Sequence, residues 1–151
     1  VYKIMELEEQ GKSFEEVTGQ VEQFVSGMNT YFVLENLDTL RKNGRLSGVK
    51  ALVASTLNIK PVMGADDGSI IQLGQGIGMK KALTRLADTA VEEAVDPASR
   101  RLMITHCSNP RAAECVRRHI EEKLHFKETL ILDTAGVSSM YANEGGVIVT
   151  I

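Results

Sequence analysis

Residues 31–63 read "YFVLENLDTLRKNGRLSGVKALVASTLNIKPVM" and change structural character several times within one short stretch. The β-branched and aromatic residues at its start predict a strand over 29–35. Asn36 can cap a short helix over 37–42, and the following Asn43-Gly44 pair is a strong signal for a helix end. The segment therefore begins with a strand that passes directly into a short helix.

The second half of the same stretch predicts another helix and another strand. Ser47 can cap a helix over 48–57, whose residues are mostly small or apolar and should be buried on several sides. In the strand expected over 58–65, Pro61 cannot donate a ladder hydrogen bond, which indicates an edge strand or a bulge. Asp67-Gly68 then favours a hairpin turn into a further strand, "SIIQL".

The rest of the chain continues this alternation. Ser13 and Glu16 have the spacing of a capping box, and Asn109 and Pro110 can open a helix. The remaining expected helices cover 2–10, 13–25, 79–95 and 111–124, and the remaining expected strands cover 101–107, 128–134 and 145–151. We therefore predict a single α/β domain over 1–151: a mixed β-sheet with packed helices, in which crossover helices give parallel pairs and the hairpin an antiparallel pair.

Charge and composition exclude several classes of partner. The 151 residues contain 17 Lys+Arg and 20 Asp+Glu, a net charge of -3, and neither sign forms the block that nucleic-acid binding requires. No apolar run approaches the roughly 20 residues of a membrane span, and the acidic start lacks the pattern of a signal peptide. We expect a cytoplasmic protein with no membrane span, and we interpret its two cysteines, Cys107 and Cys115, as reduced thiols.

Two stretches raise the question of an active site. "GQGIGMKK" at 74–81 follows a strand and precedes a helix, where phosphate-binding loops lie, but its glycine spacing fits neither the dinucleotide fingerprint nor the P-loop. "THC" at 105–107 places His106 beside a thiol, yet adjacent strand residues point to opposite faces, so a core or cap role is favoured for the histidine. No catalytic constellation and no metal site is visible, and we expect a binding protein rather than an enzyme. The alternative is an enzyme that binds a phosphorylated small molecule at the glycine-rich loop.

Arg45 stands out because of its neighbours. A cation after a helix end is commonly explained by its favourable interaction with the helix dipole. Arg41 and Lys42 already provide positive charge at this helix end. Arg45 and Ser47, however, also stand at the entrance to the expected helix 48–57, whose free amides favour an anion. An arginine, a hydroxyl and a helix N-terminus therefore converge.

These motifs resemble those of the DegV family. The resemblance is carried by a short helix that ends in a basic-x-Gly-Arg-Leu-Ser turn, by "LNIKP", and by further matches at "EEQGKSFEEV", "DGSI", "KKAL" and "ITHCSNPRAAE". It implies a bacterial protein that binds a long-chain fatty acid, with no other cofactor. It also implies a possible partner, a fatty-acid kinase that phosphorylates the acyl carboxylate presented to it.

Family members have two α/β domains, and the resemblance identifies residues 1–151 as the second, C-terminal domain. It implies that the chain's own N-terminal domain would be a further partner and would supply hydroxyl ligands that this chain lacks. Near the end, the family's usual His-x-Gly-Pro-Gly is replaced by "YANEGG", so Ala142 takes the place of a histidine. Tyr141 and Asn143 are the candidates to substitute for it.

The resemblance leads to a specific hypothesis for the ligand site. We expect Arg45 and Ser47 to lie at the polar end of an apolar cleft. The apolar positions expected to line it are Leu52, Ile59, Val62 and Met63. Plain core packing is the alternative for each of these apolar residues.

Overall fold

The chain folds into alternating helices and strands, which the computed structural model describes for residues 1–46, 58–66 and 68–151. The helices are α1 (Tyr2–Glu9), α2 (Phe14–Ser26), α3 (Asp38–Lys42), α4 (Gly78–Glu93), the 3-10 helix η2 (Pro97–Ser99), α5 (Pro110–Glu121) and α6 (Gly136–Ala142). The strands are β1 (Thr30–Val33), β2 (Ile59–Asp66), β3 (Ser69–Ile77), β4 (Arg101–His106), β5 (Glu128–Asp133) and β6 (Val147–Thr150). The helix expected over 48–57 and the turn residue Asp67 lie outside the described residues.

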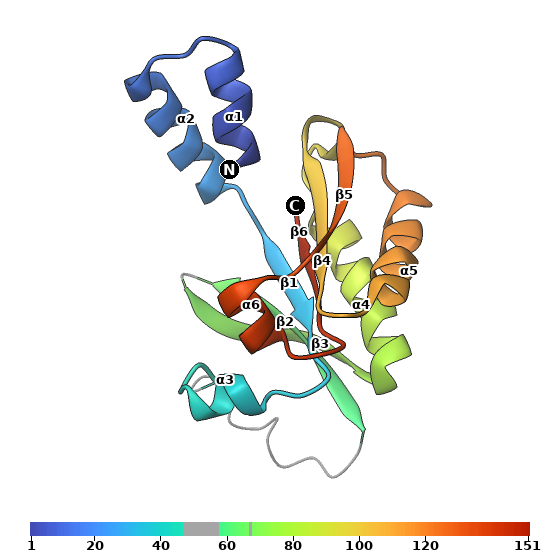
Figure 1. The fold of residues 1–151 in the computed structure, drawn as a ribbon. Coiled ribbons are helices and arrows are strands. Elements are labelled where there is room, and N and C mark those ends of the chain that lie inside the picture. The colour runs from blue at the N-terminus through green and yellow to red at the C-terminus, as the bar shows by residue number, and fades with distance from the viewer. Residues whose placement is uncertain (47–57, 67) are drawn as a thin grey trace.

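The strands form one six-stranded sheet in the order β3-β2-β1-β6-β4-β5 (Figure 1). β2 and β3 form the antiparallel hairpin, whereas β4 and β5 pair in parallel with α5 as the crossover between them. β1 and β6 lie in the middle and pair antiparallel to each other. The expected α/β fold with a mixed sheet is therefore confirmed.

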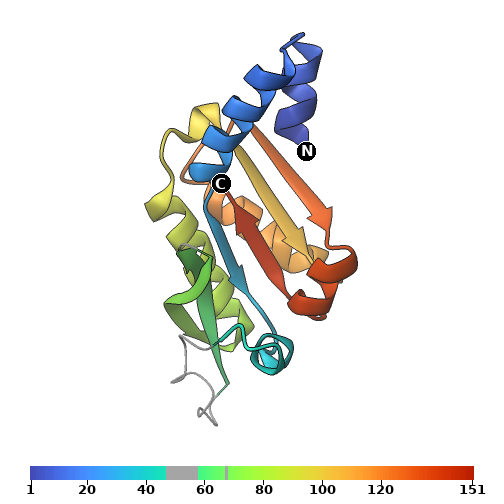
Figure 2. The ribbon, with the colours of Figure 1, turned by 90° about the vertical axis from the view of Figure 1, so that its left-hand side faces the viewer.

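The two faces of the sheet are covered by different helices (Figures 1 and 2). α4 and α5 cover one face, and the main core lies beneath them. Strand residues alternate between the faces, so Tyr31 and Val33 of β1 belong to this core, while Phe32, and Leu34 just after the strand, belong to a second cluster under α3 and α6. The position of the second cluster is thus set by the alternation along the central strand.

Pro61 lies at a local irregularity of an internal strand. β2 has neighbours on both sides, but its pairing with β1 is confined to Met63 and Gly64, so Pro61 has only β3 beside it. The register between β2 and β3 shifts between Val62 and Met63. Of the two alternatives that Pro61 indicated, the edge strand is therefore wrong, since β2 is internal, and the irregularity beside the proline agrees with a bulge.

The expected glycine-rich loop at 74–78 is wrong, because β3 continues through these residues as far as Ile77. A Cβ atom at Gly76 would lie 2.2 Å from the backbone nitrogen of Ala82, so α4 packs too closely for any side chain there. The first amide of the helix is also occupied, since the Gly78 N–H donates to the Asn58 carbonyl at 2.7 Å. Gly76 therefore allows α4 to pack closely on β3, and in the described residues no observation favours a phosphate site at this place.

α1 and α2 form a helical hairpin that projects from the sheet (Figure 1). Both halves of the expected capping box are present at the start of α2, between Ser13 and Glu16. Glu6 of α1 connects the hairpin to the sheet: its carboxylate accepts a hydrogen bond from Lys127 Nζ at 2.8 Å and lies 3.3 Å from Arg101 Nη1. The hydrogen bond from Lys127, followed by the charge of Arg101, lowers the pKa of Glu6 from 4.5 to about 2.

Replacing Gly76 by alanine should lower the free energy of unfolding by about 1 to 3 kcal/mol, because the new methyl group must displace the backbone of α4. Gly74→Ala is the matched control in the same strand. Its methyl group would meet the flexible side chain of Arg85, at 3.1 Å from Cγ, and should cost much less. Urea denaturation measures both values, and equal effects would show that close packing of α4 is not the reason for Gly76.

Replacing Glu6 by glutamine should lower the free energy of unfolding at neutral pH by about 1 kcal/mol, since partly exposed ion pairs are lost. The pKa of Glu6 is depressed in the folded protein, so its contribution is present above its ordinary pKa of 4.5 and is lost as the pH falls toward 2. The stabilities of the wild type and Glu6→Gln should therefore converge near pH 2. The same change at the exposed Glu9 is the control; a constant difference between wild type and Glu6→Gln at all pH values would contradict the assignment.

Candidate functional site

A glycine turn at the end of α3 fixes the position of Arg45. Gly44 has a positive φ of 68°, and its N–H donates to the carbonyl of Arg41 at 3.1 Å. The Arg45 N–H donates to the carbonyl of Leu40 at 2.9 Å, which completes a Schellman motif. The helix end expected at Asn43-Gly44 is confirmed, and Arg45 is the first residue beyond the left-handed glycine.

An apolar cluster lies beneath α3 and α6, on the sheet face opposite α4 and α5; we call it the α3–α6 cluster. Its buried members are Leu34, Leu40, Leu46, Met63 and Ala142, and its half-buried members are Phe32, Leu37, Ile70, Cys107, Tyr141 and Ile148. Residues far apart in the sequence therefore share one apolar surface, to which the end of α3, the β2–β3 hairpin and α6 all contribute.

A cavity of about 540 Å³ lies at the border of this cluster; we call it the Arg45 cavity. It is lined by Leu40, Gly44, Arg45, Gly68, Ser69, Ile70 and Tyr141. Among the described residues, the lining combines the cation Arg45 with the hydroxyl-bearing side chains of Ser69 and Tyr141 and with the apolar side chains of Leu40 and Ile70. This combination suits a ligand with an anionic head and an apolar tail.

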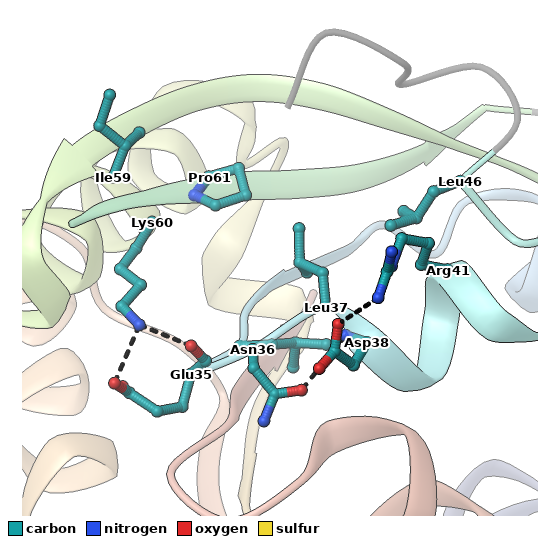
Figure 3. Close-up of a pocket in the computed structure, with 10 residues that line it drawn as sticks. Glu35, Asn36, Leu37, Asp38, Arg41, Leu46, Ile59, Lys60 and Pro61 are labelled. Atoms are coloured by element: carbon teal, nitrogen blue, oxygen red, sulfur yellow. Dashed lines mark hydrogen bonds and ion pairs between the residues drawn. The ribbon is translucent and has the colours of Figure 1, made fainter. Parts of the chain in front are cut away.

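A second cavity of about 310 Å³, which we call the Lys60 cavity, lies between the start of β2 and the segment that leads into α3 (Figure 3). It is lined by Leu34, Glu35, Asn36, Leu37, Asp38, Arg41, Leu46, Ile59, Lys60 and Pro61. Lys60 Nζ donates to Glu35 Oε1 at 2.9 Å, and Arg41 Nη2 donates to Asp38 Oδ1 at 2.9 Å. Among the residues that the structure describes, both cations that line this cavity, Arg41 and Lys60, have a carboxylate partner.

The structure brings some of the predicted ligand residues together and separates others. Arg45 and Tyr141 line the same cavity, and Met63 lies in the adjoining α3–α6 cluster. Ile59 lines the Lys60 cavity instead. Val62 is fully buried in the main core, because successive strand residues face opposite sides of the sheet.

The remaining predicted residues are Ser47, Leu52 and Asn143. Ser47 and Leu52 lie outside the described residues. The side-chain amide of Asn143 has two partners within the protein: its Oδ1 accepts from Thr39 Oγ1 at 3.3 Å, and its Nδ2 donates to the carbonyl of Tyr141 at 3.2 Å. This amide therefore links α3 to the end of α6.

Sequence reasoning did not identify Leu40, Ser69 or Ile70, and it missed α6 altogether. α6 has only 7 residues and no side-chain cap, so the usual signals for a helix start are absent. The hairpin predicted from the sequence did place Ile70 in the strand that returns beside residues 58–65, and in the structure Ile70 pairs with Ala65. Nothing in the local sequence indicates that Ile70 lies beside Arg45, because that proximity depends on how the hairpin packs against α3.

Two histidines of the described ranges lie beside an aspartate: His106 Nδ1 is 3.3 Å from Asp133 Oδ1, and His119 Nε2 is 2.8 Å from Asp88 Oδ1. His106 is buried as expected, and its Nδ1 accepts from the backbone N–H of Asn109 at 3.4 Å. Cys107 and Cys115 are free thiols. Among residues 1–46, 58–66 and 68–151, no three His, Cys, Asp or Glu side chains are grouped to hold a metal ion. No helix in the same ranges is long and apolar enough to cross a membrane.

Comparisons with known proteins agree with this architecture. The family model described as DegV matches residues 1–151. A DegV domain-containing protein of Streptococcus pneumoniae is 33% identical over 149 residues, which make up 98% of this chain and 52% of the relative. The chain thus spans about half the length of the curated relatives it matches.

Three solved structures extend the comparison. A DegV family protein from Ruminococcus gnavus with vaccenic acid is 46% identical, with a TM-score of 0.94 over 99% of this chain and 54% of that protein. The Fatty Acid Kinase (Fak) B3 protein of Streptococcus pneumoniae, loaded with linoleic acid, is 32% identical, with a TM-score of 0.87 over 99% and 53% of the two chains. A DegV family protein from Eubacterium eligens loaded with heptadecanoic acid is 27% identical, with a TM-score of 0.85 over 99% and 54%.

The family model covers the whole chain, and the fold agrees with these structures along almost its full length. The chain belongs to the DegV family.

Proposed function

We propose that this chain is the second, C-terminal domain of a fatty-acid-binding protein and that it binds the acyl carboxylate at the Arg45 cavity. The observation that carries the proposal is the cavity itself, which joins Arg45 and Tyr141 beside the α3–α6 cluster. The three similar structures described above, each with a fatty acid, support the class of ligand.

In this proposal, the carboxylate interacts with the Arg45 guanidinium and with the hydroxyl groups of Tyr141 and Ser69. A charge-assisted hydrogen bond to arginine is among the stronger polar interactions in a partly dry site. The acyl tail lies along Leu40 and Ile70 toward the α3–α6 cluster. Tyr141 then takes the part of the family histidine, since Ala142 at that position is buried in the cluster and has no polar group.

The proposed role is that of a carrier and not of an enzyme. The three similar structures each hold a fatty acid, and binding such a ligand requires an apolar site with a few polar groups and no nucleophile or general base. The likeness to the Fak B3 protein supports a partner of the fatty-acid kinase type, which would phosphorylate the bound carboxylate. A protein serving such a kinase would work in the cytoplasm, where ATP is available.

The first test replaces Arg45 by glutamine and compares a long-chain fatty acid with its neutral methyl ester. The change should weaken binding of the acid about tenfold or more, because a charge-assisted hydrogen bond contributes about 1.5 to 3 kcal/mol. Binding of the ester should be almost unchanged. Calorimetric or fluorescence titration of both ligands measures the difference.

Arg41→Gln is the matched control for this test. Arg41 lies on α3, four residues before Arg45, but is paired with Asp38 and lines the other cavity. It should leave the ratio of acid to ester affinity unchanged. If Arg45→Gln weakens both ligands equally, or neither, then Arg45 does not contact the carboxylate.

The second test concerns the other half of the relatives. Joining this chain behind the first half of the Ruminococcus gnavus protein should raise the affinity for fatty acid by about tenfold or more, because a second domain would remove more of the ligand from water. The first half alone is the control. Equal affinity of the joined protein and the 151-residue chain would show that this domain encloses the ligand by itself.

A further inference from the structure

We propose that Asn109 is a positioning residue that holds α3, and with it Arg45, in place through a relay of hydrogen bonds. The relay runs from Asn109 through the loop of residues 143–146 to Thr39 on α3. For the carboxylate this inference rests on the proposed function, but the holding of α3 can be measured without any ligand.

The two ends of the Asn109 side chain have separate partners. Its Oδ1 accepts from the N–H of Ala112 at 3.3 Å and so caps α5. Its Nδ2 donates to the carbonyl of Gly145 at 3.0 Å, on the loop between α6 and β6. A helix cap needs only the oxygen, which aspartate or serine would also provide. The amide nitrogen is therefore available for the contact with the loop.

The 143–146 loop has a conformation that its surroundings must maintain. Asn143 has a positive φ of 55°, which is unfavourable for a residue with a side chain. The loop continues the pairing of β4 with β6: the Gly145 N–H donates to the Cys107 carbonyl at 2.8 Å, and the Cys107 N–H donates to the Gly146 carbonyl at 3.0 Å. Asn109 adds a side-chain bond to this backbone pairing.

The last step of the relay reaches α3. Thr39 Oγ1 donates to Asn143 Oδ1 at 3.3 Å, a contact between residues 104 positions apart in the sequence. α3 has only 5 residues, too few to form a stable helix without tertiary contacts. Its last turn carries the Schellman motif that fixes Arg45. A shift of the loop would therefore shift the guanidinium at the polar end of the Arg45 cavity.

The test replaces Asn109 by aspartate, which keeps the cap oxygen on α5 and removes the donor to Gly145. Hydrogen exchange of backbone amides, followed by NMR in the 151-residue chain, should become about two- to tenfold faster at the end of α3, at Asn43 and Arg45. Val116 on α5 should exchange at the wild-type rate. Asn29→Asp makes the same amide-to-acid change at an exposed position between α2 and β1 and should alter neither group.

A second variant acts at the other end of the relay and covers the case in which Asn109→Asp fails to fold. Thr39→Val removes the hydroxyl with little change of shape and should speed exchange at the same α3 amides. Combining the two changes should add little to either alone, because both interrupt one path. Fully additive effects would show two independent contacts and would overturn the relay.

The ligand arm compares a long-chain fatty acid with its methyl ester in the wild type and in Asn109→Asp. Positioning of Arg45 predicts a several-fold loss of affinity for the acid and little change for the ester, which a general loosening of the fold would not give. If Asn109→Asp leaves hydrogen exchange in α3 unchanged, the inference is wrong, whatever the ligand measurements give. It is also wrong if the wild type binds the acid and Asn109→Asp binds it with the same affinity. If the wild type binds no fatty acid while α3 exchange still rises, the relay stands and the proposed function fails.

Discussion

The alternation of side chains along the central strands is the constraint on which the rest of this structure depends. In β1, Tyr31 and Val33 face α4, while Phe32, and Leu34 just after the strand, belong to the cluster on the opposite side. β2 and β6 repeat the pattern, and as a result one sheet supports two separate apolar clusters. The larger cluster, under α4 and α5, forms the main core, and the smaller one forms the floor beside the Arg45 cavity. Successive residues of a central strand therefore belong alternately to the main core and to the cluster beside the candidate site.

Glycine has two different roles around this sheet, and they have different physical causes. Gly44 is required because the backbone must turn into the left-handed region to end α3 and present Arg45. Gly76 is required because the backbone of α4 occupies the space of a side chain. The first role can be recognised from a local motif. The second depends on a helix that returns over the strand, and a glycine-rich segment of this kind is easily mistaken for an anion-binding loop.

The Arg45 cavity draws its polar groups from three elements, two of which are short helices. Arg45 follows the 5-residue α3, Ser69 begins β3, and Tyr141 lies in the 7-residue α6. Such short helices gain little stability from their own hydrogen bonds. Their positions depend on the contacts between them, among which the Thr39–Asn143 hydrogen bond links α3 to the end of α6. A site assembled in this way can be altered by residues that do not line it.

The sequence by itself determined the class of fold, the order of the longer elements and the position of Arg45 beyond a glycine turn, because capping boxes, periodicity and left-handed glycines act through near neighbours. It also predicted the hairpin that carries Ser69 and Ile70. Only the tertiary structure decided that Val62 lies in the core while Met63 lies in the α3–α6 cluster, that residues 74–77 form a strand, and that Tyr141 meets Arg45 across one cavity. These features depend on strand register and on packing between segments about a hundred residues apart, which no local pattern records.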